Sequence, residues 1–253
     1  VQGMGGTLSM TGEEGGPPAR VGFSIGDLGA GMFTALGIVS ALQERTRSGK
    51  GQKIDVSMLD CQIAFLENAF ARFFAGEVPE RTGTRHPVLT PFQALPTKDG
   101  HVAVAVWRQD WWEKFCRLLN MEHLIQDERF KTNADRTKNH DELEKILKAV
   151  IQTRTTAEWV AEMEKVDVAC GPVNTIPQVA VDPSTAARGM IRDVWHRRAG
   201  MLKVVNSPIN LSRTPVRIEK ASPDLGEHTE EILATRLGFS KEQLSTLREE
   251  KAI

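Results

Sequence analysis

GDLGAGMFTALGIVSAL, at residues 26–42, is the most informative segment for the architecture of this chain. Asp27 stands among glycines just before a helical pattern, which predicts the N-cap of a helix. Apolar residues then recur at helical spacing, so the pattern predicts one buried face. That face comprises Met32, Ala35, Leu36, Val39 and Leu42. Arg45 and Arg47 suit the negative end of the helix dipole, and Gly49 predicts where the helix ends.

The residues after this helix predict a strand and then a second helix. Gln52–Met58 places Ile54, Val56 and Met58 on one side, which is the alternation of a half-buried strand. Leu59–Ala75 is rich in alanine and phenylalanine and predicts a helix. Helix, strand and helix in this order favour an α/β fold.

Glycine and proline punctuate Gly76–Pro96, which indicates a linker into a second domain. Strands are predicted at Phe92–Pro96 and His101–Trp107, because the Asp-Gly pair of Lys98-Asp99-Gly100 is typical of a hairpin turn. Cys170-Gly171-Pro172 predicts an interruption of regular structure. The remaining predicted elements are helices near 110–120, 140–152 and 155–165, short strands within 186–215, and helices at 229–237 and 240–249.

These elements predict an α/β protein of two lobes. Residues 1–80 and 186–253 are expected to share a large α/β domain, to which the chain returns after a smaller α+β domain at 81–185. The chain starts at Val1 with no polar lead-in, so the large domain is expected to be incomplete at its N-terminus.

Composition excludes several functional classes. The 253 residues carry a net charge of −1 without a basic stripe, which argues against a nucleic-acid partner. Three cysteines lie far apart without metal-ligand spacing, so no metal is expected. No secretory signal is visible, and the apolar stretch Leu28–Leu42 is shorter than the ~20 residues of a spanning helix. The sequence therefore predicts a cytoplasmic protein without a membrane partner.

Asp27 is the residue that local physical chemistry singles out as a catalytic candidate. A carboxylate at a helix N-terminus lies beside unpaired N–H groups and a positive dipole end, which both favour the ionised form. Gly26, Gly29 and Gly31 leave room beside it, so a second molecule could approach. An ionised carboxylate with that access can attack an activated acyl group. From this feature alone, helix capping is the more common role of an aspartate at such a position.

Six motifs in order carry a resemblance to a known family, the class III coenzyme A-transferases (CaiB/BaiF), which include formyl-CoA transferase and carnitine CoA-transferase. The motifs are Gly12–Pro18 with Gly26–Ile38, Arg47–Ser57, Arg85–Pro87, Thr97–Gly100, Cys170–Val173 and Leu225–Thr229. The resemblance covers essentially the whole chain. The segment between Pro87 and Pro96 lacks the glycine run of formyl-CoA transferase, which argues against that particular enzyme.

The resemblance implies an enzyme that moves CoA from an acyl-CoA thioester to a carboxylic acid. Asp27 matches the family's nucleophile, which forms a mixed anhydride and then an aspartyl-CoA thioester. Gly26, Gly29 and Gly31 beside it, and His86 in the Arg-His-Pro loop, are the expected substrate-binding residues. The family further implies an interlocked homodimer, with a CoA thioester as cosubstrate and no metal.

Two alternatives stay open. The α-methylacyl-CoA racemases share the fold and the aspartate, and they carry an acidic residue soon after the small-domain hairpin, where Asp110 stands here. They pair the aspartate with a histidine that would lie before Val1. Family members also have an N-terminal segment with much of the CoA pocket, so a truncated, non-catalytic fragment is the other alternative.

Overall fold

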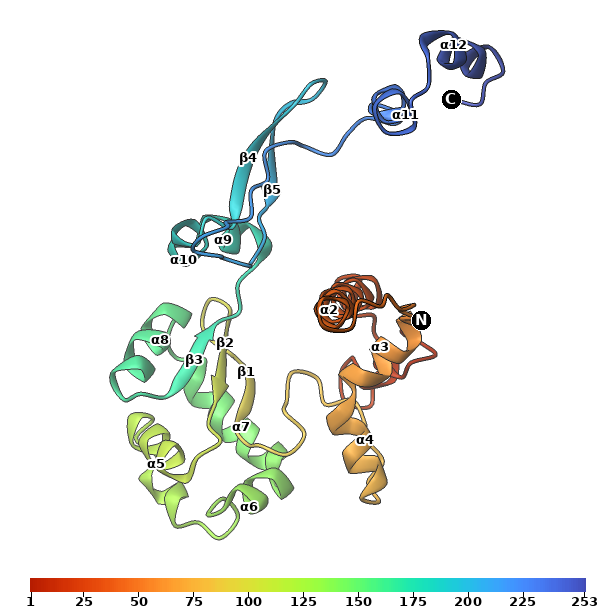
Figure 1. Ribbon diagram of the computed structural model, residues 1–253. Coiled ribbons are helices and arrows are strands. Elements are labelled where there is room, and N and C mark those ends of the chain that lie inside the picture. The colour runs from red at the N-terminus through yellow and green to blue at the C-terminus, as the bar shows by residue number, and fades with distance from the viewer. The chain divides into compact units, whose positions relative to one another are not determined.

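The computed structural model describes residues 1–253, which form two compact units, Val1–Val173 and Asn174–Ile253 (Figure 1). Helices and small sheets alternate along the chain. The division expected from sequence, with residues 186–253 returning to the domain of residues 1–80, stays a prediction.

The first unit begins with four helices, which are α1 (Thr7–Met10), α2 (Ile25–Ser48), α3 (Met58–Phe65) and α4 (Glu67–Phe74). Helix α2 ends as predicted at Gly49, whose left-handed backbone (φ 73°) lets its N–H donate to the Arg45 carbonyl. Its start differs from the prediction. Ser24 is the N-cap, and Asp27 therefore lies inside the first turn.

The predicted strand at Gln52–Met58 is wrong, because Gln52–Ser57 pairs with no other strand and Met58 begins α3. The Ser57 hydroxyl accepts the N–H groups of Leu59 and Asp60, which starts the helix one residue earlier than expected. The helix predicted over Leu59–Ala75 is interrupted at Leu66, which separates α3 from α4.

The predicted buried face of α2 is also wrong. Met32, Leu36 and Val39 are 64%, 63% and 64% exposed. The buried residues of the helix are instead Gly26 and Gly29, which lie on its side toward α3. Spacing identified a continuous apolar face, but no other part of the first unit covers it.

Helix α2 is also the one helix long and apolar enough to cross a membrane, with 24 residues and an 18-residue window of mean hydropathy 1.6. This corrects the expectation drawn from the shorter stretch Leu28–Leu42. A single helix of this kind is weak support for a membrane protein, since core helices of soluble proteins meet the same criterion.

A three-stranded antiparallel sheet organises the rest of the first unit, in the order β1 (Phe92–Pro96), β2 (His101–Ala105) and β3 (Ala169–Pro172). The predicted hairpin is confirmed, with Leu95 opposite Val102 on its buried face. The predicted interruption at Cys170-Gly171-Pro172 is wrong, because these residues form β3 and pair with β2.

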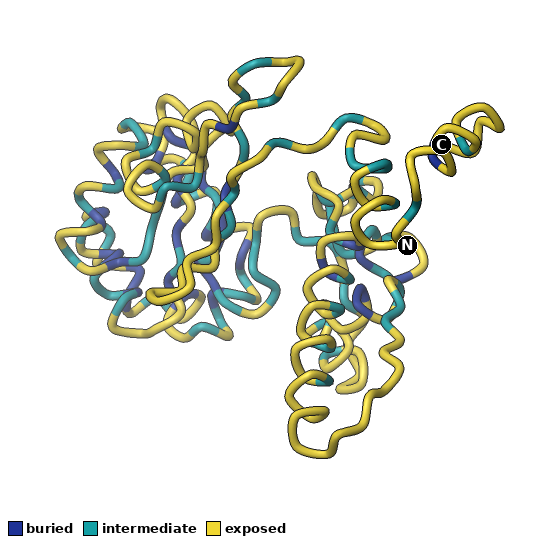
Figure 2. The backbone as a smooth tube through the Cα atoms, turned by 45° about the horizontal axis from the view of Figure 1, so that its top comes forward, coloured by how far each residue is buried: buried dark blue, intermediate teal, exposed yellow.

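Helices pack on this sheet to form the main hydrophobic core. They are α5 (Gln109–Leu118), the short helix η1 (Glu122–Ile125), α6 (Asn133–Lys138), α7 (His140–Ile151) and α8 (Thr156–Lys165). The helices predicted near 110–120, 140–152 and 155–165 are confirmed, whereas α6 was not predicted. Trp112, Phe115 and Phe130 are fully buried in this core, and Figure 2 shows the buried positions concentrated in this part of the chain.

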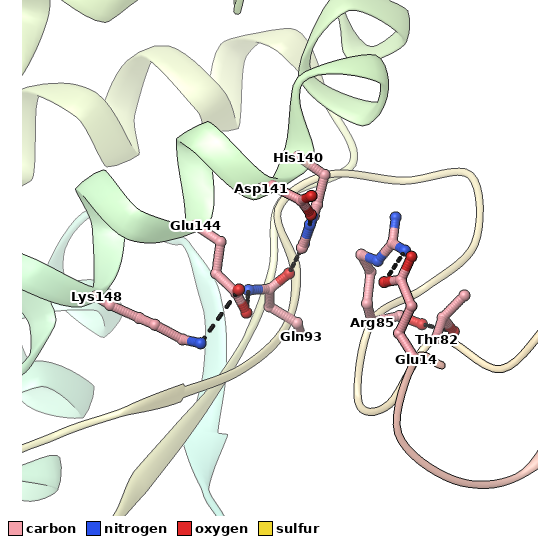
Figure 3. A network of polar contacts seen from close by, with 8 residues as sticks. All are labelled: Glu14, Thr82, Arg85, Gln93, His140, Asp141, Glu144 and Lys148. Atoms are coloured by element: carbon pink, nitrogen blue, oxygen red, sulfur yellow. Dashed lines mark hydrogen bonds and ion pairs between the residues drawn. The ribbon is translucent and has the colours of Figure 1, made fainter. Parts of the chain in front are cut away.

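A buried polar network joins β1 to α7 (Figure 3). His140 Nε2 lies 2.6 Å from Gln93 Oε1, and Gln93 Nε2 donates to the Glu144 carboxylate at 3.0 Å. Lys148 forms an ion pair with Glu144 at 3.1 Å. Burial lowers the pKa of His140, and the positive charge of Arg85 lowers it further, whereas the Asp141 and Glu144 carboxylates oppose this shift.

The second unit contains few buried residues and two pairs of helices. Its elements are α9 (Ile176–Val181), α10 (Pro183–Ala187), β4 (Ile191–His196), β5 (Gly200–Val205), α11 (Thr229–Leu237) and α12 (Lys241–Glu249). Strands β4 and β5 form an antiparallel hairpin, which confirms the strands predicted within 186–215. The two closing helices are confirmed as well.

The His140 network predicts a loss of stability in mild acid. The unfolded chain binds a proton at His140 near its reference pKa of about 6.5, whereas the folded chain keeps the imidazole neutral to lower pH. The free energy of unfolding should therefore fall as pH drops from 7 toward 5. Urea unfolding at both pH values should show a smaller fall for His140→Gln, with His101→Gln at an exposed position as control. An unchanged pH dependence in His140→Gln would contradict this role.

Candidate active site

Asp27 lies in the first turn of α2 and is exposed to solvent. Its carboxylate forms no ion pair and no hydrogen bond within the chain. The Leu28 N–H donates to the Ser24 carbonyl, but the N–H groups of Gly26 and Asp27 have no hydrogen-bond partner, and Ser24 supplies no side-chain cap. The structure thus places an exposed carboxylate beside free donors at the positive end of a 24-residue helix.

The glycines beside Asp27 differ in their surroundings. A Cβ atom at Gly29 would lie 2.4 Å from Phe65 Cε2, so this glycine allows α2 and α3 to pack closely. Gly26 is buried against Met58 and Gln62 of α3. Gly31 faces open space, with no atom within 4 Å of a built Cβ. Substrate binding by Gly26, Gly29 and Gly31 stays a prediction, and Gly31 is the one with free access.

Gln62 is a polar residue beside this turn that sequence reasoning missed. It belongs to α3 and is completely buried, and its Oε1 accepts a hydrogen bond of 2.6 Å from the Thr7 hydroxyl. Its Nε2 has no hydrogen-bond partner. A buried amide left unpaired in this way costs about 1–3 kcal/mol of stability. The available signal was a glutamine within the apolar sequence Cys61–Phe65.

His86 lies in the loop before β1, and it makes no hydrogen bond to α2. Its imidazole stacks on the Phe92 ring at 5.1 Å, and Nδ1 accepts the Val88 N–H at 3.3 Å. Burial lowers the pKa of His86, and the positive charge of Arg72 lowers it further. The half-buried imidazole is therefore neutral near pH 7, and its role in substrate binding stays a prediction.

Asp110 has a local partner that accounts for its position. Both carboxylate oxygens accept hydrogen bonds of 2.9 Å from the Arg108 guanidinium, in the first turn of α5. This ion pair is exposed.

A groove of about 370 Å³ lies between α2 and the start of α3. Phe33 and Gly37 of α2 line it together with Ile54, Ser57 and Cys61, and Asp27 is not among the lining residues. No group of three or more His, Cys, Asp or Glu side chains is arranged to hold a metal ion.

Comparison with known proteins places these features in one family. The model of CoA-transferase family III matches residues 1–229. The chain belongs to CoA-transferase family III. The resemblance read from the sequence motifs is thereby confirmed.

The chain is similar to several proteins that are named CoA-transferases. A succinate–glutarate CoA-transferase of Agrobacterium fabrum is 34% identical, over 92% of this chain and 59% of the relative. A succinyl-CoA:glutarate CoA-transferase of Homo sapiens is 30% identical, over 96% of this chain and 56% of the relative. An acetyl-CoA:oxalate CoA-transferase of Acetobacter aceti is 36% identical, over 84% of this chain and 54% of the relative. The chain thus spans little more than half the length of these relatives.

Solved structures confirm the expected α/β class. The crystal structure of a CaiB/BaiF family protein from Brucella suis is 35% identical with a TM-score of 0.77, over 92% of this chain and 61% of that one. A protein from Mycobacterium tuberculosis shares the fold with a TM-score of 0.78 at 23% identity, over 90% of this chain and 61% of that one.

The different surroundings of Gly29 and Gly31 predict opposite effects of the same substitution. Gly31→Ala should stabilise the chain by about 0.5–1 kcal/mol, because alanine favours the helix and the site is open. Gly29→Ala should destabilise it by about 1–3 kcal/mol, because the new methyl group overlaps the Phe65 ring. Urea unfolding followed by circular dichroism measures both changes.

A double variant tests the cause of the loss at Gly29. Phe65→Ala should relieve part of the effect of Gly29→Ala, so that the two changes together cost less than their sum. Equal stabilities of Gly29→Ala and Gly31→Ala would contradict close packing of α2 on α3.

Proposed function

We propose that this chain is part of an enzyme that transfers CoA from an acyl-CoA thioester to a carboxylic acid, with Asp27 as nucleophile. The observation that carries the proposal is the exposed, unpaired Asp27 carboxylate in the first turn of α2, in a member of CoA-transferase family III. The surroundings suit attack on a thioester, because the free N–H groups beside the carboxylate can donate hydrogen bonds to the carbonyl oxygen and stabilise the negative charge that develops on it.

The transfer has four steps in this proposal. The Asp27 carboxylate attacks the thioester carbonyl carbon, and the C–S bond breaks to give a mixed anhydride and CoA thiolate. The thiolate then attacks the aspartyl carbonyl, which releases the first acid and leaves an aspartyl-CoA thioester. The acceptor carboxylate attacks that thioester and forms a second anhydride, again with release of thiolate. Attack of the thiolate on the new acyl carbon yields the product acyl-CoA and restores Asp27.

Backbone geometry supports Asp27 in this role. The N–H groups of Gly26 and Asp27 carry no intrachain hydrogen bond, so they are free to donate to an oxyanion at the start of α2. The open side of Gly31 leaves space on the next turn for the approaching substrate. His86, with its lowered pKa, would offer a neutral imidazole to the acyl group.

The relatives suggest the class of acid. Several are named for short dicarboxylic acids, including succinate with glutarate, and oxalate. We therefore propose a dicarboxylic acid or its CoA thioester on at least one side of the reaction. On the basis of the resemblance to the family, we also propose that the protein is a homodimer located in the cytoplasm.

Replacing Asp27 by asparagine separates a chemical role from a structural one. Asparagine is close to aspartate in size and polarity, so a position in the first turn should tolerate it at a cost below about 1 kcal/mol. An amide cannot form the acyl-enzyme, so CoA transfer by the full-length protein should fall by several orders of magnitude. Transfer between succinyl-CoA and a panel of dicarboxylates measures the rate.

Trapping identifies the residue directly. Wild-type protein mixed with acyl-CoA and hydroxylamine or borohydride should carry a modification on the peptide that contains Asp27, detected by mass spectrometry. Near wild-type turnover by a folded Asp27→Asn variant, with no label on this peptide, would remove Asp27 from the mechanism.

Proton exchange distinguishes a transferase from a racemase. In heavy water and without an acceptor acid, the transferase should leave the α-proton of a 2-methylacyl-CoA unexchanged, since its chemistry stays at the carbonyl carbon. Mass spectrometry of the recovered acyl-CoA measures deuterium uptake. Rapid uptake at the α-carbon, lost in Asp27→Asn, would favour the racemase alternative.

A further inference from the structure

We propose that Gln62 is a positioning residue for the nucleophile, and that Thr7 holds it in place. The inference rests on the proposed function of Asp27. In this inference the buried side-chain amide of Gln62 in α3, hydrogen-bonded to Thr7 of α1, supports the turn of α2 that carries Asp27.

One hydrogen bond and two close-lying glycines define the surroundings of the Gln62 side chain. The Thr7 hydroxyl donates to Oε1 at 2.6 Å, and Thr7 is itself buried. A Cβ atom at Gly5 would lie 2.7 Å from Gln62 Cβ, so the turn before α1 closes over the side chain. On the other side, a Cβ atom at Gly26 would lie 3.6 Å from Gln62 Nε2. The amide is thus held between the N-terminal turn and the first turn of α2.

The amide lies with its carbonyl side toward Thr7. The Thr7 hydroxyl donates to Oε1, and the NH₂ group therefore points away from Thr7. That group lies on the side of Gly26 where a Cβ atom would stand, and it has no acceptor. A methionine would fill the same volume without an unpaired donor, so packing alone does not explain a glutamine here.

The location of the unpaired donors explains what the amide can do. The NH₂ group of Gln62 lies beside the first turn of α2, which carries the free N–H groups of Gly26 and Asp27, and all three groups lack partners. Gln62 therefore fixes the turn that presents the Asp27 carboxylate and directs its dipole toward the place where negative charge develops. Because the group is fully buried, it acts through the turn and does not touch the substrate.

Two substitutions in the full-length protein test this role. Gln62→Met keeps the volume and removes the unpaired donor, but it also removes the acceptor of the buried Thr7 hydroxyl, so these opposing effects should leave thermal stability little changed. The kcat should nevertheless fall about 10- to 100-fold, because a small displacement of the nucleophile slows attack. The KM for acyl-CoA should change less than about twofold, because no contact with substrate is lost. The single-turnover rate of Asp27 labelling should fall in parallel with kcat.

Thr7 provides an independent variant and a rescue. Thr7→Val removes the hydroxyl that orients Gln62 and should lower kcat, whereas Thr7→Ser retains the hydrogen bond and should restore most of it. Thr7→Val keeps the proposal testable if Gln62→Met does not fold. Gln43→Met, at an exposed position of α2, is the matched control and should leave both kcat and stability unchanged.

Two results would overturn the inference while the proposed function stands. One is full kcat in a stable Gln62→Met variant or in Thr7→Val. The other is lower thermal stability with unchanged kcat per folded molecule, which would make the amide a purely structural group. Failure of the proposed function would look different, since wild-type protein would then transfer no CoA, or Asp27→Asn would retain activity.

Discussion

The arrangement of the candidate site depends on the close approach of α2 to α3 at Gly29. A side chain there would overlap the Phe65 ring, so only glycine permits the two helices to pack at this distance. The same packing buries Gly26 and places Gln62 against the first turn of α2. The exposed carboxylate of Asp27 therefore belongs to a turn whose other side is closely packed. Such packing keeps the turn rigid, and functional groups on rigid elements are held more precisely than groups on loops.

The main core and the candidate site belong to different parts of the first unit. The main core lies within residues 95–168, where helices cover one face of the three-stranded sheet. Helix α2 contributes nothing to that core and exposes most of its apolar residues. The apolar residues of this exposed face also give α2 its high mean hydropathy. The same residues therefore account for its resemblance to a membrane-spanning helix.

Family membership and local geometry support the proposed reaction independently. The family model covers residues 1–229 and relates the chain to transferases that act on different acids. The geometry of α2 contains nothing specific to one acid, because its free donors are backbone groups and its carboxylate would attack any thioester carbonyl. Discrimination between acids must therefore come from side chains outside the first turn of α2, and His86 is one candidate.

Local sequence signals were sufficient for several elements that local interactions decide. The Asp-Gly hairpin, the end of α2 at Gly49 and the two closing helices were predictable, because turn chemistry, caps and periodicity act within a few residues. Asp27 was predictable as a candidate from its glycine-rich helix start and its family motif. Tertiary contacts decided the rest: β3 forms because β2 offers an open edge, and Gln52–Ser57 is no strand because it has no partner. Gln62 became visible only in three dimensions, because an unpaired donor is defined by its neighbours, and Thr7 lies 55 residues away along the chain.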